Sequence, residues 1–279
     1  MAQDGAGRRL VLHLGVQKTG TTSLQRFLKL NAEALSDLLV IRTPEEGTPM
    51  RPLGRAAIAA SLGDSGDLRR ALKVAFEDVL ETIPDGPQAV LISHENLAGA
   101  MPGNGGETQL YPALPRMLQQ LDTVARSRGF DPHHVFYTRR MTAWKPSVWA
   151  QAVRTDGYAE TREAFLTQTS ELPGWGDLER RLARQLGPDR VTRLALEAET
   201  DPDRPGQQLL AIAGIGPDRV AGLWPLQSRA MERLNDGSTE FLRRLNGLAL
   251  NPHARGRIVD LVTRSQHLFT ADMPSEGTL

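Results

Sequence analysis

Short apolar runs alternate with longer amphipathic stretches along the first two thirds of the chain. Several of the short runs are apolar at successive positions, which is typical of parallel strands buried on both faces. We predict strands at residues 10–14, 39–41, 89–93, 135–138 and 191–196. The intervening stretches carry apolar residues at helical spacing, as at Leu24, Phe27, Leu28 and Leu35. We predict helices at residues 22–35, 67–83, 110–128, 144–153 and 177–186.

This alternation of strand and helix predicts an α/β fold, a parallel β-sheet flanked by helices on both faces. After Gly214 the pattern changes, and glycine and proline residues interrupt it repeatedly. Two further helices are predicted near residues 239–248 and 253–265. The length of 279 residues suits one large domain. We therefore predict a single domain over residues 1–279, in which residues 215–279 form a helical C-terminal cap.

Composition and charge narrow the classes of function. Lys and Arg total 33, and Asp and Glu also total 33, so the chain has no net positive charge that would attract nucleic acid. We therefore expect no nucleic-acid partner. The absence of cysteine excludes disulfides, thiolate metal sites and a cysteine nucleophile. No segment reaches the roughly 18 apolar residues of a membrane span. We expect a soluble, cytoplasmic protein.

The segment LVLHLGVQKTGTTSLQRFL, residues 10–28, carries the strongest chemical signal. A buried strand ends at Gly15, a tight loop follows, and a helix begins near Thr21. Backbone N–H groups at the start of a helix form an anion site, which Lys18 and the nearby hydroxyl groups would strengthen. The alternative is a Gly- and Thr-rich helix cap in which Lys18 is a solvated surface charge.

This loop differs from the nucleotide-binding Walker loop, in which a lysine directly follows the second glycine. Here Thr21 follows Gly20, and Lys18 lies two residues before that glycine. A nucleoside triphosphatase would lack its usual lysine at the β- and γ-phosphates, which argues against ordinary ATP or GTP hydrolysis.

The run Lys18-Thr19-Gly20-Thr21-Thr22 resembles the 5′-phosphosulfate loop of sulfotransferases, and residues 13–28 are most similar to bacterial members of that family. The resemblance implies a P-loop-like fold and 3′-phosphoadenosine 5′-phosphosulfate (PAPS) as co-substrate, with Lys18 acting in catalysis. It also implies that PAPS contacts Gln17, Lys18, Thr19, Gly20, Thr21, Thr22 and Ser23.

A second segment, VFYTRRMTAWKPSVWAQ at residues 135–151, is similar to the family's 3′-phosphate motif. That motif has an arginine at the end of a strand and a serine eight residues later, and Arg139 and Ser147 have this spacing. Arg140 is the competing arginine. Pro146 indicates that the helix begins there. The C-terminal Arg-Lys-Gly element of the eukaryotic members is absent, and Arg229 or Arg233 is a candidate replacement.

His94 and Glu95 end the strand at residues 89–93, where the resemblance implies a catalytic base. Imidazole has the more suitable pKa near neutrality, so chemistry alone leaves both residues open. The Ser-Glu pair of bacterial relatives favours Glu95. His13 is expected in the core, and His133 and His134 are expected to be solvent-exposed. No His and Asp spacing suggests a metal site, and we predict none.

The resemblance implies a PAPS-dependent sulfotransferase that transfers a sulfuryl group to a hydroxyl or amine of a carbohydrate or another small molecule. One alternative is a nucleotide or small-molecule kinase with an atypical loop. The other is a non-catalytic nucleotide-binding protein of the same fold.

Overall fold

The computed structural model describes residues 7–101, 109–227 and 234–270. The chain forms two compact units. The larger consists of residues 1–102, 107–141 and 172–230, and the smaller of residues 103–106, 142–171 and 231–279. The smaller unit thus combines an internal segment with the C-terminal part of the chain.

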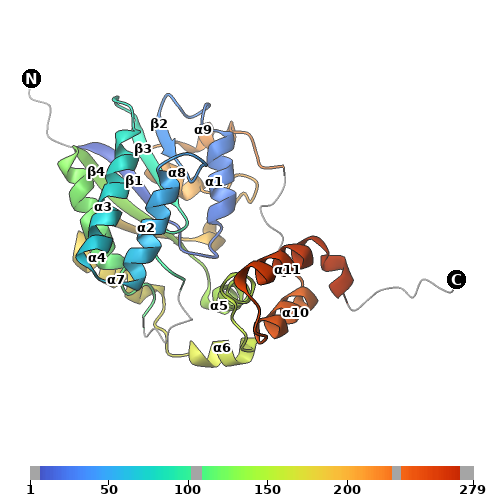
Figure 1. Ribbon diagram of the computed structural model, residues 1–279. Helices are drawn as coiled ribbons and strands as arrows, with labels where there is room; N and C mark the ends of the chain where they lie inside the picture. Colours follow the sequence, from blue (N-terminus) through green and yellow to red (C-terminus); the bar gives the residue numbers. More distant parts are fainter. Residues whose placement is uncertain (1–6, 102–108, 228–233, 271–279) are drawn as a thin grey trace, which may run out of the picture. The chain divides into compact units, whose positions relative to one another are not determined.

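A parallel five-stranded sheet forms the centre of the larger unit (Figure 1). Its strands are β1 (Arg8–Leu14), β2 (Leu39–Arg42), β3 (Ala89–His94), β4 (Phe130–Thr138) and β5 (Val191–Ala195). Their order is β2-β3-β1-β4-β5, and every neighbouring pair is parallel. Because β1 is central, the loop that follows it lies between the ends of β3 and β4. The predicted parallel sheet is confirmed.

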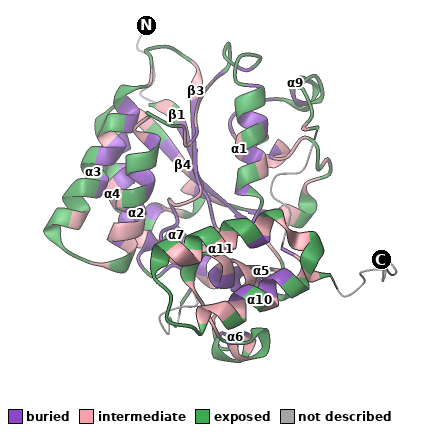
Figure 2. Cartoon of the chain, turned by 45° about the vertical axis from the view of Figure 1, so that its right-hand side comes forward, coloured by how far each residue is buried: buried purple, intermediate pink, exposed green. Residues whose placement is uncertain are grey.

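Helices cover both faces of this sheet (Figure 2). On one face lie α1 (Thr21–Leu30), α8 (Gln207–Ile212) and α9 (Pro217–Ala221), and on the other lie α2 (Met50–Leu62), α3 (Gly66–Glu81), α4 (Leu114–Ser127) and α7 (Trp175–Leu186). Strand residues alternate between the faces, so Val11 and Val135 join a core with Phe27 of α1 and Leu209 of α8. This arrangement confirms the predicted three-layer α/β fold.

The larger unit differs from the sequence prediction in its local boundaries. Helix α1 ends at Leu30 rather than near residue 35, and the side chain of Asn31 donates to the carbonyl of Phe27 at 3.0 Å. Helix α2 was not predicted, since Pro52 and Gly54 interrupt its apolar pattern. Strand β4 begins at Phe130 instead of residue 135.

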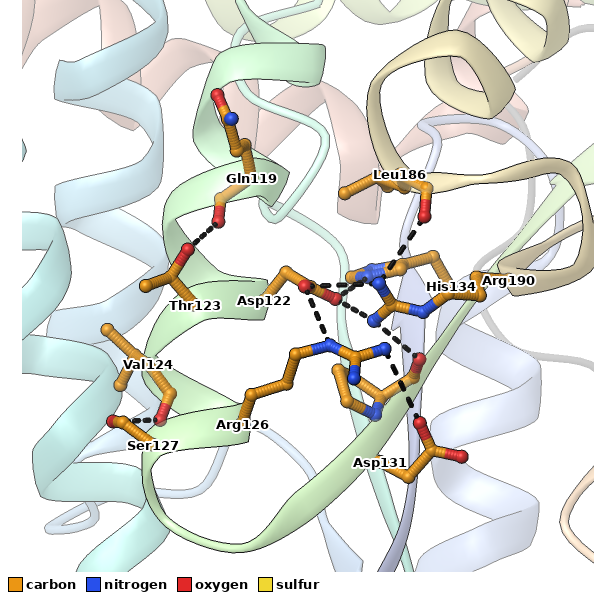
Figure 3. Close-up of polar contacts among 11 residues, drawn as sticks. Gln119, Asp122, Thr123, Val124, Arg126, Ser127, Asp131, His134, Leu186 and Arg190 are labelled. Carbon is orange, nitrogen blue, oxygen red and sulfur yellow. Dashed lines mark hydrogen bonds and ion pairs between the residues drawn. The ribbon is translucent and has the colours of Figure 1, made fainter. Parts of the chain in front are cut away.

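The earlier start of β4 places His134 within the sheet, where it is fully buried, so the prediction that it is exposed is wrong. The prediction is also wrong for His133, which is half-buried and hydrogen-bonds Thr192. His134 Nε2 lies 3.2 Å from Oδ1 of Asp122 on α4, which also accepts hydrogen bonds from Arg126 and Arg190 (Figure 3). The cluster joins α4, β4 and the short helix η2 (Pro188–Arg190).

The smaller unit is helical. It contains most of α5 (Met141–Gln151), then the π-helical turn η1 (Ala152–Asp156), α6 (Arg162–Gln168), α10 (Asp236–Asn246), α11 (Pro252–Arg264) and the 3₁₀ turn η4 (Gln266–Phe269). The guanidinium of Arg255 donates to the carbonyls of Val153 and Arg154 at 2.9 and 3.0 Å, which satisfies backbone groups at the π-helical turn.

The predicted helices near residues 239–248 and 253–265 are confirmed as α10 and α11. That they cap the sheet, within one domain, stays a prediction. Helix α5 begins at Met141 and continues past Pro146, so the predicted start at Pro146 is wrong. In the described part of the chain, no helix combines the length and apolar character needed to cross a membrane.

Candidate functional site

The loop between β1 and α1 follows a tightly constrained path. The Gly15 N–H donates to the carbonyl of His94 at 2.9 Å, and the Thr19 hydroxyl donates to the carbonyl of Val16 at 2.6 Å. Lys18 has φ = 66° and Gly20 has φ = 86°. Glycine adopts such angles readily, whereas for lysine they cost free energy, and such strain often occurs at functional sites.

Helix α1 begins at Thr21 without a capping side chain and without an acidic residue in its first turn. Its first intrahelical bond runs from the Leu24 N–H to the Gly20 carbonyl at 3.1 Å, so the preceding amides are at the positive end of the helix dipole. The Thr21 hydroxyl is buried and has no hydrogen-bond partner among the described residues. A buried, unpaired hydroxyl beside these amides fits an anionic group rich in acceptor oxygens.

Gln17 anchors the same loop to a neighbouring segment. Its Nε2 donates to the carbonyl of Gly99 at 2.8 Å, and its Oε1 accepts from the hydroxyl of Tyr111 at 2.7 Å. Tyr111 is buried, and burial raises its pKa, so the hydroxyl stays protonated and donates. Sequence reasoning missed Tyr111.

The end of β3 packs directly against the beginning of this loop. A Cβ atom at Gly15 would lie 2.3 Å from Cα of Glu95 and 2.5 Å from the carbonyl oxygen of His94. Glycine at position 15 therefore lets the two backbones touch. The structure brings the loop that carries Lys18 next to the strand end that carries His94 and Glu95.

Both ring nitrogens of His94 are engaged in hydrogen bonds. Its Nε2 donates to the carbonyl of Met50 at 2.9 Å, so Nδ1 is the acceptor for the Asn96 N–H at 3.0 Å. Burial lowers the pKa of His94 by more than the Glu95 carboxylate and the Met50 carbonyl raise it. Gly54 on α2 makes room for the ring, since a Cβ there would lie 2.2 Å from Cε1. His94 is therefore a neutral, buried imidazole.

The side chain of Glu95 is 43% exposed. Its carboxylate lies 3.6 Å from Nδ1 of His94, which carries no hydrogen to donate to it. Oε2 instead accepts a hydrogen bond from Nε2 of Gln25 on α1 at 3.1 Å. A half-exposed carboxylate held by one amide retains lone pairs that can accept a proton.

Arg139 and Arg140 follow β4 directly. The indole N–H of Trp175 donates to the carbonyl of Arg139 at 2.7 Å, while the Arg140 N–H donates to Oε1 of Glu197 at 2.9 Å. The Arg140 guanidinium also forms an ion pair with Glu197 at 3.6 Å. Helix α5 carries Ser147, which is buried in the smaller unit.

The pairing of Arg139 with Ser147 stays a prediction, and Arg229 and Arg233 lie outside the described residues. Within residues 7–101, 109–227 and 234–270, no three His, Asp or Glu side chains are grouped to hold a metal ion.

No protein-family model matches the chain, and no curated protein matches it. The solved structures to which the chain is similar include two sulfotransferases. One is a sulfotransferase from Alicyclobacillus acidocaldarius, with 15% identity over 96% of this chain and 98% of that chain and a TM-score of 0.49. The other is the sulfotransferase domain from the curacin biosynthetic pathway, with 12% identity over 96% of this chain and all of that chain and a TM-score of 0.34.

Proposed function

We propose that this chain is a PAPS-dependent sulfotransferase. The observation that carries the proposal is the β1–α1 loop, in which Lys18 precedes the second glycine and α1 begins uncapped beside the buried, unpaired hydroxyl of Thr21. An anion with several acceptor oxygens would satisfy these donors. The position of the lysine favours a phosphosulfate over the triphosphate of a Walker-type enzyme.

The 5′-phosphosulfate is proposed to bind the amides and hydroxyls of residues 19–23 and the ammonium of Lys18. The 3′-phosphate is assigned to Arg139 and Ser147. Arg139 is preferred to Arg140 because it lies eight residues before Ser147, which is the spacing of the family's 3′-phosphate motif. A guanidinium suits this task because its planar fork binds phosphate with two parallel hydrogen bonds.

In the proposed reaction, the bond between sulfur and the phosphate oxygen breaks and a bond between sulfur and the acceptor oxygen or nitrogen forms, giving adenosine 3′,5′-bisphosphate (PAP). Lys18 would stabilise the negative charge that develops on the departing phosphate oxygen. Glu95 would take the proton of the acceptor hydroxyl or amine. Glu95 is preferred to His94 because both imidazole nitrogens are already used.

The 3′-phosphate separates this function from that of a kinase, because PAP carries this group and AMP does not. We expect PAP to bind roughly 60- to 1,000-fold more tightly than AMP, from an arginine contact and a hydroxyl contact together. Arg139→Ala should remove most of that preference and leave AMP affinity nearly unchanged, whereas Arg140→Ala serves as the matched control. Calorimetry on the three proteins with both ligands measures the difference. Equal affinity of the wild type for PAP and AMP would refute the proposal.

A thermal-shift series separates the remaining alternatives. A ligand that binds only the folded state raises stability, and the gain grows with the logarithm of ligand concentration once this exceeds Kd. A sulfotransferase should be stabilised by PAP without Mg²⁺, whereas a kinase should respond most to ATP with Mg²⁺. A non-catalytic nucleotide-binding protein would bind PAP, yet it would transfer no sulfuryl group from labelled PAPS to 2-naphthol or glucosamine.

A further inference from the structure

Gln25 on α1 contacts the proposed base and belongs to neither phosphate motif. Its Nε2 lies 3.1 Å from Oε2 of Glu95, 3.2 Å from the Ser93 carbonyl oxygen and 3.4 Å from Oγ of Ser93. Gln25 lies one helical turn after Thr21, so the side chains of Gln25 and Thr21 share a face of α1. The same face of the helix therefore serves both the anion site and Glu95.

The acceptors around Gln25 determine the orientation of its amide group. The Ser93 carbonyl and the Glu95 carboxylate only accept hydrogen bonds, so the NH₂ group faces them. One of its two hydrogens is directed to Glu95, and the other is directed to Ser93. Ser93 therefore anchors the amide, and the amide in turn holds the carboxylate.

Ser93 is itself fixed by a buried histidine. His13 on β1 is fully buried, and its Nδ1 lies 2.8 Å from Oγ of Ser93. Burial lowers the pKa of His13 to about 3, so the ring is neutral. The hydrogen bond between Nδ1 of His13 and Oγ of Ser93 fixes the Ser93 side chain. The chain His13–Ser93–Gln25–Glu95 thus links β1, β3 and α1.

We propose that Gln25 is a positioning residue, anchored through Ser93 and His13, that holds the Glu95 carboxylate in place to accept the proton of the sulfuryl acceptor. This role rests on the proposed function of Glu95. A glutamate on the loop after a strand has several rotamers, and a misplacement of about 1 Å can cost roughly 100-fold in rate. The amide restricts the carboxylate without supplying or removing a proton.

Gln25→Met tests the role because methionine has a similar length and no donor. Turnover of labelled PAPS with 2-naphthol, or with glucosamine if that is the better acceptor, should fall about 10- to 100-fold, with PAP affinity unchanged within about twofold. Gln208→Met is the matched control, since Gln208 Nε2 donates to Oε1 of Glu199 at 3.2 Å in the same unit. The control should retain wild-type turnover.

A double-mutant cycle separates positioning from a general structural effect. If Gln25 acts only through Glu95, Gln25→Met should have almost no further effect on turnover in a Glu95→Gln background. An equal loss of turnover in both backgrounds would overturn the proposal. So would wild-type turnover in Gln25→Met.

The side-chain amide signals of Gln25 provide a readout that needs no activity. In ¹⁵N-labelled full-length protein these signals are assigned by their loss in Gln25→Met. Glu95→Ala should shift them, because it removes the carboxylate that accepts one amide hydrogen, and Glu199→Ala should leave them in place. Unshifted signals in Glu95→Ala would overturn the contact even if the wild type transfers sulfuryl groups. A shift in a protein without sulfuryl transfer would support the contact and refute the proposed function instead.

Discussion

At the scale of single residues, Lys18 combines a positive charge with a backbone conformation that lysine rarely adopts. Its φ of 66° is typical of glycine, and holding a bulkier residue there costs roughly 1–3 kcal/mol. The surrounding contacts of Gln17 and Thr19 stabilise the loop in this conformation. Lys18 adopts this unfavourable backbone conformation next to the uncapped start of α1. This placement supports the proposal that its ammonium binds the anion.

Replacing Lys18 by alanine should lower kcat more than it weakens PAP binding. An electrostatic group aimed at the departing oxygen is worth about 100- to 1,000-fold in rate. Lys18→Arg should not restore full activity, since the wider guanidinium does not replace a compact ammonium. Lys29→Ala is the matched control, because Lys29 lies at the end of the same helix and pairs with Glu45. Unchanged turnover in Lys18→Ala would exclude this role.

The two candidate bases should respond differently to substitution. Glu95→Gln keeps the size of the side chain and removes the proton acceptor, so turnover should fall about 100- to 10,000-fold with the melting temperature preserved. His94→Gln should mainly lower the melting temperature, because it disrupts a buried ring bonded to Met50 and Asn96. Steady-state kinetics and thermal melts of both variants make the comparison. An inactive, fully stable His94→Gln together with an active Glu95→Gln would reverse the assignment.

At the scale of elements, the site depends on the close approach of the loops that follow β1 and β3. Gly15 makes this approach possible, and Gln17 adds a second link through the Gly99 carbonyl. Helix α2 contributes from outside the motif region, since its Met50 carbonyl accepts the hydrogen bond of His94. The candidate catalytic residues are therefore held by backbone contacts between elements that are distant in sequence.

Gly15→Ala should separate these two elements. The added Cβ would overlap backbone atoms of His94 and Glu95, which cannot rotate away as a side chain can. We expect a loss of about 3 kcal/mol in the free energy of unfolding, together with loss of turnover. Gly66→Ala at the start of α3 is the control, because a Cβ there meets nothing within 4 Å and stability should change by less than about 0.5 kcal/mol. Urea unfolding of both variants measures the difference, and equal stability of the two would contradict the close contact.

At the scale of the whole molecule, buried titratable groups link the larger unit's stability to pH. Burial lowers the pKa of both His13 and His134. Burial raises the pKa of Asp122, but its hydrogen bonds from His134 and Arg190 lower it by more, so its pKa is below the ordinary value. All three groups bind protons more readily in the unfolded chain than in the folded one.

Stability should therefore fall on acidification. The two histidines contribute stability that is fully present above their ordinary pKa of 6.5 and is lost as pH falls below it, and Asp122 adds a loss below its ordinary value of 3.8. For His13, whose folded pKa is about 3, the free energy of unfolding should fall by up to roughly 1.4 kcal/mol per pH unit below 6.5.

Urea unfolding between pH 7.5 and 5 measures this slope. His13→Gln should flatten it, whereas His253→Gln, on an exposed position of α11, should leave it as in the wild type. The slopes are compared rather than the absolute stabilities, because His13→Gln also alters a core contact with Ser93. A wild-type slope in His13→Gln would show that His13 does not contribute to the pH dependence.

The sequence by itself determined the sheet and the location of the candidate anion site. Apolar runs predict strands because burial on both faces of a parallel sheet requires them, and all five predicted strands are present. The loop from Gly15 to Ser23 was predictable because glycine and hydroxyl residues between a strand and a helix indicate an anion site from the local sequence alone. The first residue of a strand depends on the neighbouring strand as well as on the local pattern. Strand β4 starts at Phe130 because Phe130 pairs with Arg8, the first residue of β1.

Only the tertiary structure decided what surrounds each candidate residue. The ring of His94 donates a hydrogen bond to the carbonyl of Met50, 44 positions away. The side-chain amide of Gln25 donates to Ser93 and Glu95, which are 68 and 70 positions away. Asp122 on α4 provides the hydrogen-bond partner of the buried His134 Nε2 and is itself held by Arg190 from another element. A sequence pattern reports the local preference of a segment for helix, strand or turn. Hydrogen bonding and the desolvation that shifts a pKa depend on which distant segments pack together, and no local pattern contains that information.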